Sequence, residues 1–232
     1  MSVTTHRVHH PDVVKLGRIY TPDTQDALYP LSMMMSIAAP RTVPWTIGPV
    51  LDQGQTPRCV GFTTRDWLNA EPQSDPDQAN PSPQQLYDGA QTNDGISGPH
   101  DGSNDRGAMK YLQNINFVDA YHWAQSVDEA IQYLTTTGPL MCGASWHQGQ
   151  FTPDQNGFIR PIGPVEGGHE FLAYFYDATA RAFWFQNSWG LSWGKVPGAP
   201  GTFRILRSDI DTLFAEGMDF CAATVHFPRP VL

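Results

Sequence analysis

A cysteine, a histidine and an asparagine follow one another in this sequence in an order that permits acyl transfer. Cys59 comes directly after the turn-rich loop 52–58 and begins the stretch 59–70, whose apolar residues recur at helical spacing. We therefore expect its thiol in the first turn of a helix. The partial positive charge at a helix N-terminus favours the thiolate, which is the form of cysteine that attacks a carbonyl carbon.

A thiol nucleophile needs a base, and His169 is the candidate. It follows Gly167 and Gly168 and opens the alternating pattern 169–176, while Asn187 ends the next predicted strand, 182–187. Taken singly, Cys59 is more simply interpreted as a small buried core residue, and His169 as a structural histidine. The chain order Cys, His, Asn favours a catalytic centre.

Two motifs resemble those of the papain-like cysteine peptidase family. Gln53 stands in a Gln-Gly loop six residues before Cys59, and residues 187–194 read Asn-Ser-Trp-Gly-Leu-Ser-Trp-Gly, a complete match to the family's Asn-Ser-Trp-Gly-x-x-Trp-Gly run. The resemblance covers about residues 43–227 and is thin between about 71 and 165. It indicates a short member of the family, of bacterial or phage type and without an evident pro-region.

The resemblance implies a role for each matching residue. Cys59 would be the nucleophile, His169 the base and later the acid, and Asn187 would orient the imidazole. Gln53 and the Cys59 backbone amide would form the oxyanion hole. The remaining candidates are implied as substrate-binding or shielding residues: Gly102, Ser103, Gly168, Glu170 and Trp189.

The sequence departs from the family pattern at three positions around these motifs. Thr56 replaces the upstream cysteine that is normally disulfide-bonded, and Val60 replaces the tryptophan after the nucleophile. Glu170 stands where an alanine usually follows the histidine. A carboxylate there predicts a preference for a basic or amine-bearing substrate side chain. Gly102 and Ser103 also have a structural alternative, since they precede the predicted helix 104–113 and could cap it.

Three functions fit these observations. The first is a thiol peptidase that hydrolyses peptide or isopeptide bonds through a thioester acyl-enzyme. The second is a transpeptidase, in which an amine captures the same intermediate. The third is a catalytically idle structural or binding component of a bacterial or phage assembly. The sequence contains no Cys-x-x-Cys and no His-Glu-x-x-His motif, so we expect neither a metal nor a cofactor.

Composition limits the partners and the location. The 232 residues include 14 basic and 23 acidic ones, giving a net charge of −9, and no basic patch is evident, so nucleic acid is not an expected partner. A peptide or protein substrate is. No signal sequence, no membrane-spanning stretch and only three cysteines are present, which predicts a cytoplasmic protein or one held within a virion or other assembly.

The elements that must position the site divide into helices first and strands later, which predicts an α+β, two-lobed papain-like fold. A helical lobe of about 50–120 would carry the central nucleophile helix, and an antiparallel β-barrel-like lobe of about 121–227 would complete the domain 43–227. Residues 1–42 form an N-terminal arm that packs on the body and lacks the length and helical periodicity of an inhibitory pro-region. Helices are predicted at 59–70, 83–90, 104–113 and from 127, and strands at 140–146, 157–160, 169–176, 182–187, 201–206 and 218–226.

Overall fold

The computed structural model describes residues 16–75, 77 and 80–226. Outside this range lie residues 1–15, for which no signal sequence is predicted, and residue 227, the predicted end of the domain. The helices are α1 (Cys59–Asn69), α2 (Pro83–Asn93), α3 (Asp105–Asn114), α4 (Val127–Thr136) and α5 (Arg207–Ala215), with 3-10 turns η1 (Thr24–Leu28), η2 (Leu31–Met34) and η3 (Gln148–Phe151).

The predicted helices α1 to α4 are confirmed, and local hydrogen bonds explain where they begin. Ser82 and Gln85 form a reciprocal capping box at α2, with distances of 2.8 and 3.3 Å, and the side chain of Ser126 accepts the Glu129 N–H at α4. Helix α5 was not predicted. It follows a strand directly and its N-cap, Leu206, offers no side-chain acceptor, so the sequence carries no start signal.

Six strands form one antiparallel sheet in the order β1-β6-β2-β3-β4-β5. They are β1 (Val118–Trp123), β2 (Leu140–His147), β3 (Val165–Asp177), β4 (Ala182–Gln186), β5 (Thr202–Leu206) and β6 (Asp219–Val225). The prediction of a strand at 157–160 is wrong, because Phe158 makes only an isolated bridge to Arg204. Strand β1 was not predicted; it pairs at the sheet edge with β6, which is distant in sequence.

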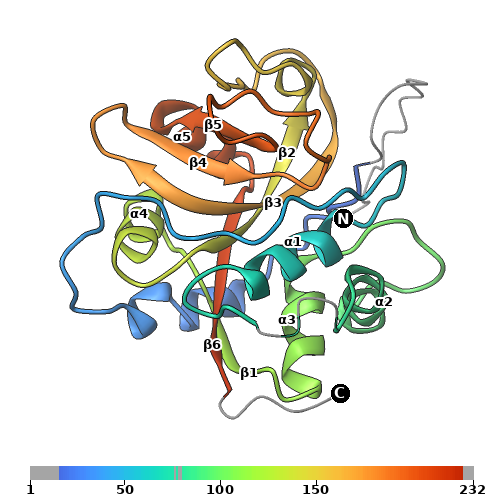
Figure 1. The fold of residues 1–232 in the computed structure, drawn as a ribbon. Coiled ribbons are helices and arrows are strands. Elements are labelled where there is room, and N and C mark those ends of the chain that lie inside the picture. The colour runs from blue at the N-terminus through green and yellow to red at the C-terminus, as the bar shows by residue number, and fades with distance from the viewer. Residues whose placement is uncertain (1–15, 76, 78–79, 227–232) are drawn as a thin grey trace.

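Two hydrophobic cores lie on the two faces of the central strands. Cys142 and Phe171 belong to one core with α4 and α5, whereas their neighbours Met141 and Leu172 belong to the other with α1, α2 and α3. This follows from the alternation of side chains along a strand. Figure 1 shows α1, α2 and α3 grouped on one side of the molecule and β4, β5 and α5 on the other. Cys142 and Cys221 are buried in strands, as predicted.

The helices of the described residues are short. The longest, α1 and α2, have 11 residues each, about half of what a bilayer requires, and none of the helices in this part of the chain is long and apolar enough to cross a membrane.

Two sets of contacts hold helix α1 in place, one at Gly61 and one at Arg65. A side chain at Gly61 would overlap the Pro83 carbonyl oxygen, so glycine lets α1 and α2 approach closely. Arg65 is fully buried; its guanidinium donates to Asp75 at 2.7 Å and to Asn69 at 3.0 Å. The helix that carries Cys59 is therefore held to the loop that follows it.

We predict that Arg65→Ala lowers the free energy of unfolding by about 3–5 kcal/mol, because it breaks the buried ion pair with Asp75 and removes the bond to Asn69. The matched control is Arg160→Ala, which breaks the ion pair with Asp209 at a site where the arginine side chain is 62% exposed, and which should cost about 1 kcal/mol or less. Urea denaturation measures both. Similar losses in the two variants would contradict the structural role of Arg65.

Candidate active site

The loop before Cys59 is tied to the segment that carries Asn187. The side-chain amide of Gln53 donates to the Thr56 carbonyl at 2.7 Å, and its oxygen accepts from the Ser188 hydroxyl at 2.8 Å. The Gln53 backbone N–H also donates to the Ser188 carbonyl at 2.9 Å. These bonds hold the first turn of α1, where Cys59 is the first residue, against the end of β4.

His169 lies on β3, and Asn187 follows β4. The His169 Nε2 and the Asn187 Oδ1 are 2.8 Å apart, and the same oxygen accepts the Ser188 N–H at 2.8 Å. Because a carbonyl oxygen can only accept, Nε2 must carry the hydrogen, which leaves the lone pair of the neutral ring on Nδ1. Nδ1 has no hydrogen-bond partner among the described residues. It is therefore the atom that can take a proton.

Aromatic rings cover the His169–Asn187 hydrogen bond. The Trp189 ring lies 4.6 Å from the His169 ring between centroids, and the Trp146 ring meets it edge-on at 4.9 Å. His169 and Asn187 are both fully buried. Exclusion of water strengthens this hydrogen bond and limits rotation of the imidazole.

Cys59 lies beside the strand that carries His169. Burial is the main influence on its sulfur and raises the pKa of Cys59 to about 12, while hydrogen bonding from the backbones of Glu170, Gly17 and Val60 lowers it in part. Burial also lowers the pKa of His169 to about 4, against the opposing effect of Asn187. Both groups are therefore uncharged at neutral pH in this state. The thiolate form expected from the sequence is not the one that this environment favours.

The N-terminal arm covers the site. The Arg18 N–H donates to the Gly168 carbonyl at 2.9 Å, and the Ile19 N–H donates to the Ser103 carbonyl at 2.7 Å. In return the Ser103 N–H donates to the Gly17 carbonyl at 2.9 Å, so that the arm pairs in parallel with Ser103. The backbone positions implied as substrate-binding are thus occupied by the chain itself.

Glycines allow this close approach. A side chain at Gly17 would overlap the Pro57 carbonyl oxygen, one at Gly102 the Gly17 oxygen, and one at Gly168 the Arg18 oxygen. Gly102 also has a φ of 94°, which only glycine adopts readily. Gly102 and Ser103 do not cap α3, because the N-cap is Asn104, whose side chain accepts the Gly107 N–H at 2.8 Å.

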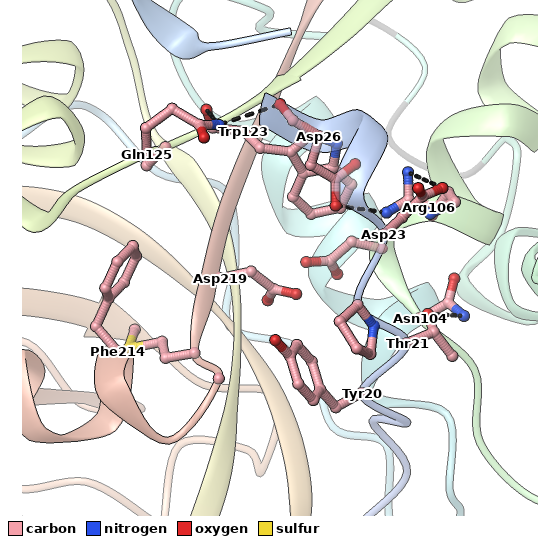
Figure 2. A pocket seen from close by; sticks show the side chains of 15 residues that line it. Tyr20, Thr21, Asp23, Asp26, Asn104, Arg106, Trp123, Gln125, Phe214 and Asp219 are labelled. Atoms are coloured by element: carbon pink, nitrogen blue, oxygen red, sulfur yellow. Dashed lines mark hydrogen bonds and ion pairs between the residues drawn. The ribbon is translucent and has the colours of Figure 1, made fainter. Parts of the chain in front are cut away.

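The arm has a second set of anchors in addition to its bonds to Ser103 and Gly168. Arg106 binds Asp26 at 2.6 Å, and Asn104 donates to the Thr21 hydroxyl at 2.9 Å (Figure 2). The described part of the arm therefore contacts the body, and the backbone of Gly17 also lies against Cys59, which the sequence did not predict. Gly17 and Arg18 carry no sequence signal that distinguishes them from other loop residues.

The described residues contain no group of three or more His, Cys, Asp or Glu side chains that could hold a metal ion. The described state brings the residue types of thiol acyl transfer to the junction of α1 and β3, but it contains no hydrogen bond between the Cys59 sulfur and His169 Nδ1.

Comparisons with known proteins identify the fold. No protein-family model and no curated protein matches the chain. Xylellain, a cysteine protease from Xylella fastidiosa, matches with a TM-score of 0.68 and 19% identity over 96% of this chain and 99% of its own. A proCathepsin B from Trypanosoma congolense matches with a TM-score of 0.61 and 14% identity (91% and 83%), and a cysteine protease from Carica candamarcensis with 0.56 and 16% (77% and 93%). The predicted papain-like α+β fold is thereby confirmed.

We predict that Gly17→Ala speeds alkylation of Cys59 by iodoacetamide by about tenfold or more, because the added methyl group overlaps Pro57 and lifts the arm from the sulfur. In the original chain the alkylation rate should rise with pH up to at least about pH 9, since the pKa of Cys59 lies near 12. Peptide mapping by mass spectrometry measures the label at each cysteine.

Two controls accompany this measurement. Cys142 and Cys221, buried in strands, report general unfolding in the same digest. Ile37→Ala alters an arm residue that is fully exposed and should leave the Cys59 rate unchanged. Equal Cys59 rates in Gly17→Ala and the original chain would mean that the arm does not protect the sulfur.

Proposed function

We propose that this chain, whose fold is papain-like, is a cysteine peptidase that hydrolyses peptide or isopeptide bonds through Cys59, His169 and Asn187. One observation carries the proposal: the hydrogen bond from His169 to Asn187 leaves Nδ1 as the unpaired acceptor on a ring whose strand lies against Cys59. A structural histidine needs no such arrangement. The similarity to cysteine proteases of known structure supports the same conclusion.

The proposed reaction uses these residues in the following order. After the arm moves away, the Cys59 thiol gives its proton to His169 Nδ1, and the sulfur attacks the carbonyl carbon of the substrate. The Cys59 backbone N–H and the Gln53 side-chain amide donate to the oxyanion. His169 then returns the proton to the leaving amine, and a thioester remains on Cys59. Water, deprotonated by His169, releases the acid and restores the thiol.

Each residue contributes a separate effect. Asn187 fixes the tautomer and the orientation of the imidazole. When Asn187 is lost, the imidazole is still present, but it is often in the wrong tautomer or orientation to act as the base. Gln53 supplies a donor that acts only on the developing charge, and loss of one such donor typically reduces the rate by about 10²–10³. Solvent that enters when the arm leaves reduces the burial that keeps Cys59 and His169 neutral.

The arm makes the described state a latent one. It takes the backbone hydrogen bonds of Ser103 and Gly168 that an extended peptide would need. A peptide must therefore compete with a segment of the same chain, which is present at high effective concentration. Activity should accordingly be low in the original chain and higher when residues 16–20 are displaced.

We predict that Cys59→Ala, made in the Gly17→Ala background, reduces hydrolysis of a mixed peptide pool at least 10⁴-fold, whereas Asn187→Ala reduces it by about 10–10³-fold. Cys142→Ala is the matched control, because it also removes a buried thiol but one within a strand. Chromatography of the products with and without an added amine separates hydrolysis from transpeptidation. Full turnover by the Cys59→Ala protein, or no turnover by any open variant, would leave only a structural role for the fold.

A further inference from the structure

We propose that the acidic pocket filled by Arg18 is a specificity pocket, and that it takes the arginine side chain of a substrate. This inference rests on the proposed function, since it assigns the substrate class of the same site. It starts from the Arg18 side chain, which the arm places in this pocket. The arm thus acts as a ligand that the chain itself provides.

The Arg18 side chain is held by direct polar contacts. Its Nη2 lies 2.7 Å from Asp219 Oδ2 and donates to the Gly217 carbonyl at 3.0 Å, and only 4% of the side chain is exposed. The guanidinium carbon also lies 4.8 Å from the centre of the Tyr20 ring. A guanidinium removed from water to this degree is stable only when carboxylates and further acceptors surround it.

Two more carboxyl groups complete the pocket. A side-chain atom placed on Gly143 would meet Arg18 Nε, Asp219 Oδ1 and Glu170 Oε2 at once, so these three groups converge on one point above the β2 backbone. Asp105, from the first turn of α3, lies against Glu170, and neither carboxyl receives a donor from the other described residues. Glycine at position 143 is therefore what leaves room for the guanidinium.

The charge of the pocket exceeds what Arg18 supplies. Three acidic side chains, Asp105, Glu170 and Asp219, face one cation. Burial and the neighbouring carboxyls raise the pKa of Glu170 and raise the pKa of Asp105 to about 7, so a proton is shared between these two groups near neutrality. With an apolar or acidic side chain in this place, Asp219 would lose the guanidinium that it binds.

The acidic lining extends beyond the pocket. A cavity of about 220 Å³ borders Asp105 and Asp219, and it is also lined by Asp23 and Asp26 of the arm. Figure 2 shows the side chains of Asp219 and Tyr20 directed into this cavity. Solvent therefore reaches Asp219, whose side chain is 28% exposed, whereas Asp23 and Asp26 are paired with Arg106, which also lines the cavity.

The residue that fills the pocket directly follows the arm residue that contacts the Cys59 sulfur. The Gly17 backbone is the part of the arm that hydrogen-bonds toward Cys59, and Arg18 is the next residue along the chain. The arm runs from Gly17 to Arg18 and pairs in parallel with Ser103, so a peptide that runs the opposite way places the arginine directly before the residue whose carbonyl acylates Cys59. A test substrate of that order is an acyl-Arg-Gly amide with a fluorogenic leaving group.

The first experiment measures binding without catalysis. In Arg18→Ala, ethylguanidine reproduces the part of the side chain that was removed, and ethylurea has the same shape without the charge. Calorimetry should show that Arg18→Ala binds ethylguanidine about tenfold or more tightly than it binds ethylurea. The original chain should bind neither compound, and adding Asp219→Asn to Arg18→Ala should abolish the binding of ethylguanidine. Asp128→Asn, which breaks an exposed ion pair with Arg207, is the control and should keep binding.

The second experiment does not depend on Arg18→Ala being folded. In the Gly17→Ala protein, the acyl-Arg-Gly substrate should have a kcat/KM about tenfold or more above that of its citrulline analogue, which is neutral and of the same shape. Equal kcat/KM values, or equal binding of ethylguanidine and ethylurea, would overturn the assignment. Binding of ethylguanidine without hydrolysis of any peptide would support the pocket and contradict the peptidase.

Discussion

The contact between the first turn of α1 and β3 is the constraint on which the site depends. Cys59 begins the helix and His169 lies in the strand, and neither can act unless the two elements meet at this point. Gln53 enforces the contact from one side, because its side chain joins the loop before Cys59 to Ser188. Asn187, the residue before Ser188, then holds the imidazole. One short segment thus positions both the loop before Cys59 and the imidazole of His169, the proposed nucleophile and base.

The arm adds a second constraint that opposes the first. Burial raises the pKa of Cys59 and lowers that of His169, so both groups are neutral in the state in which the arm is in place. The hold is partly electrostatic, since Arg18 and Arg106 anchor the arm through Asp219 and Asp26. Asp219, which holds Arg18 of the arm, is also one of the groups that would select a substrate, which links latency to specificity.

The sequence predicted the features that depend on local signals. Cys59, His169 and Asn187 stand in motifs with fixed spacing, and the starts of α2 and α4 carry caps, so these could be placed in advance. The acidic pocket could not, because Asp105, Glu170 and Asp219 come from α3, β3 and β6 and meet only after the sheet has formed. The path of the arm was missed for a similar reason. Its backbone bonds to Ser103 and Gly168 involve partners distant in sequence, and a five-residue segment has no periodicity of its own.

A covalent intermediate on the sulfur tests this account most directly. The Gly17→Ala protein would be mixed with an acyl-Arg-Gly methyl ester, quenched with acid within seconds and mapped by mass spectrometry. The account predicts one acyl group, attached to Cys59 and removed by hydroxylamine as a thioester should be. An acyl group on another residue, or none under conditions where the ester is consumed, would contradict the assignment of Cys59 as the nucleophile.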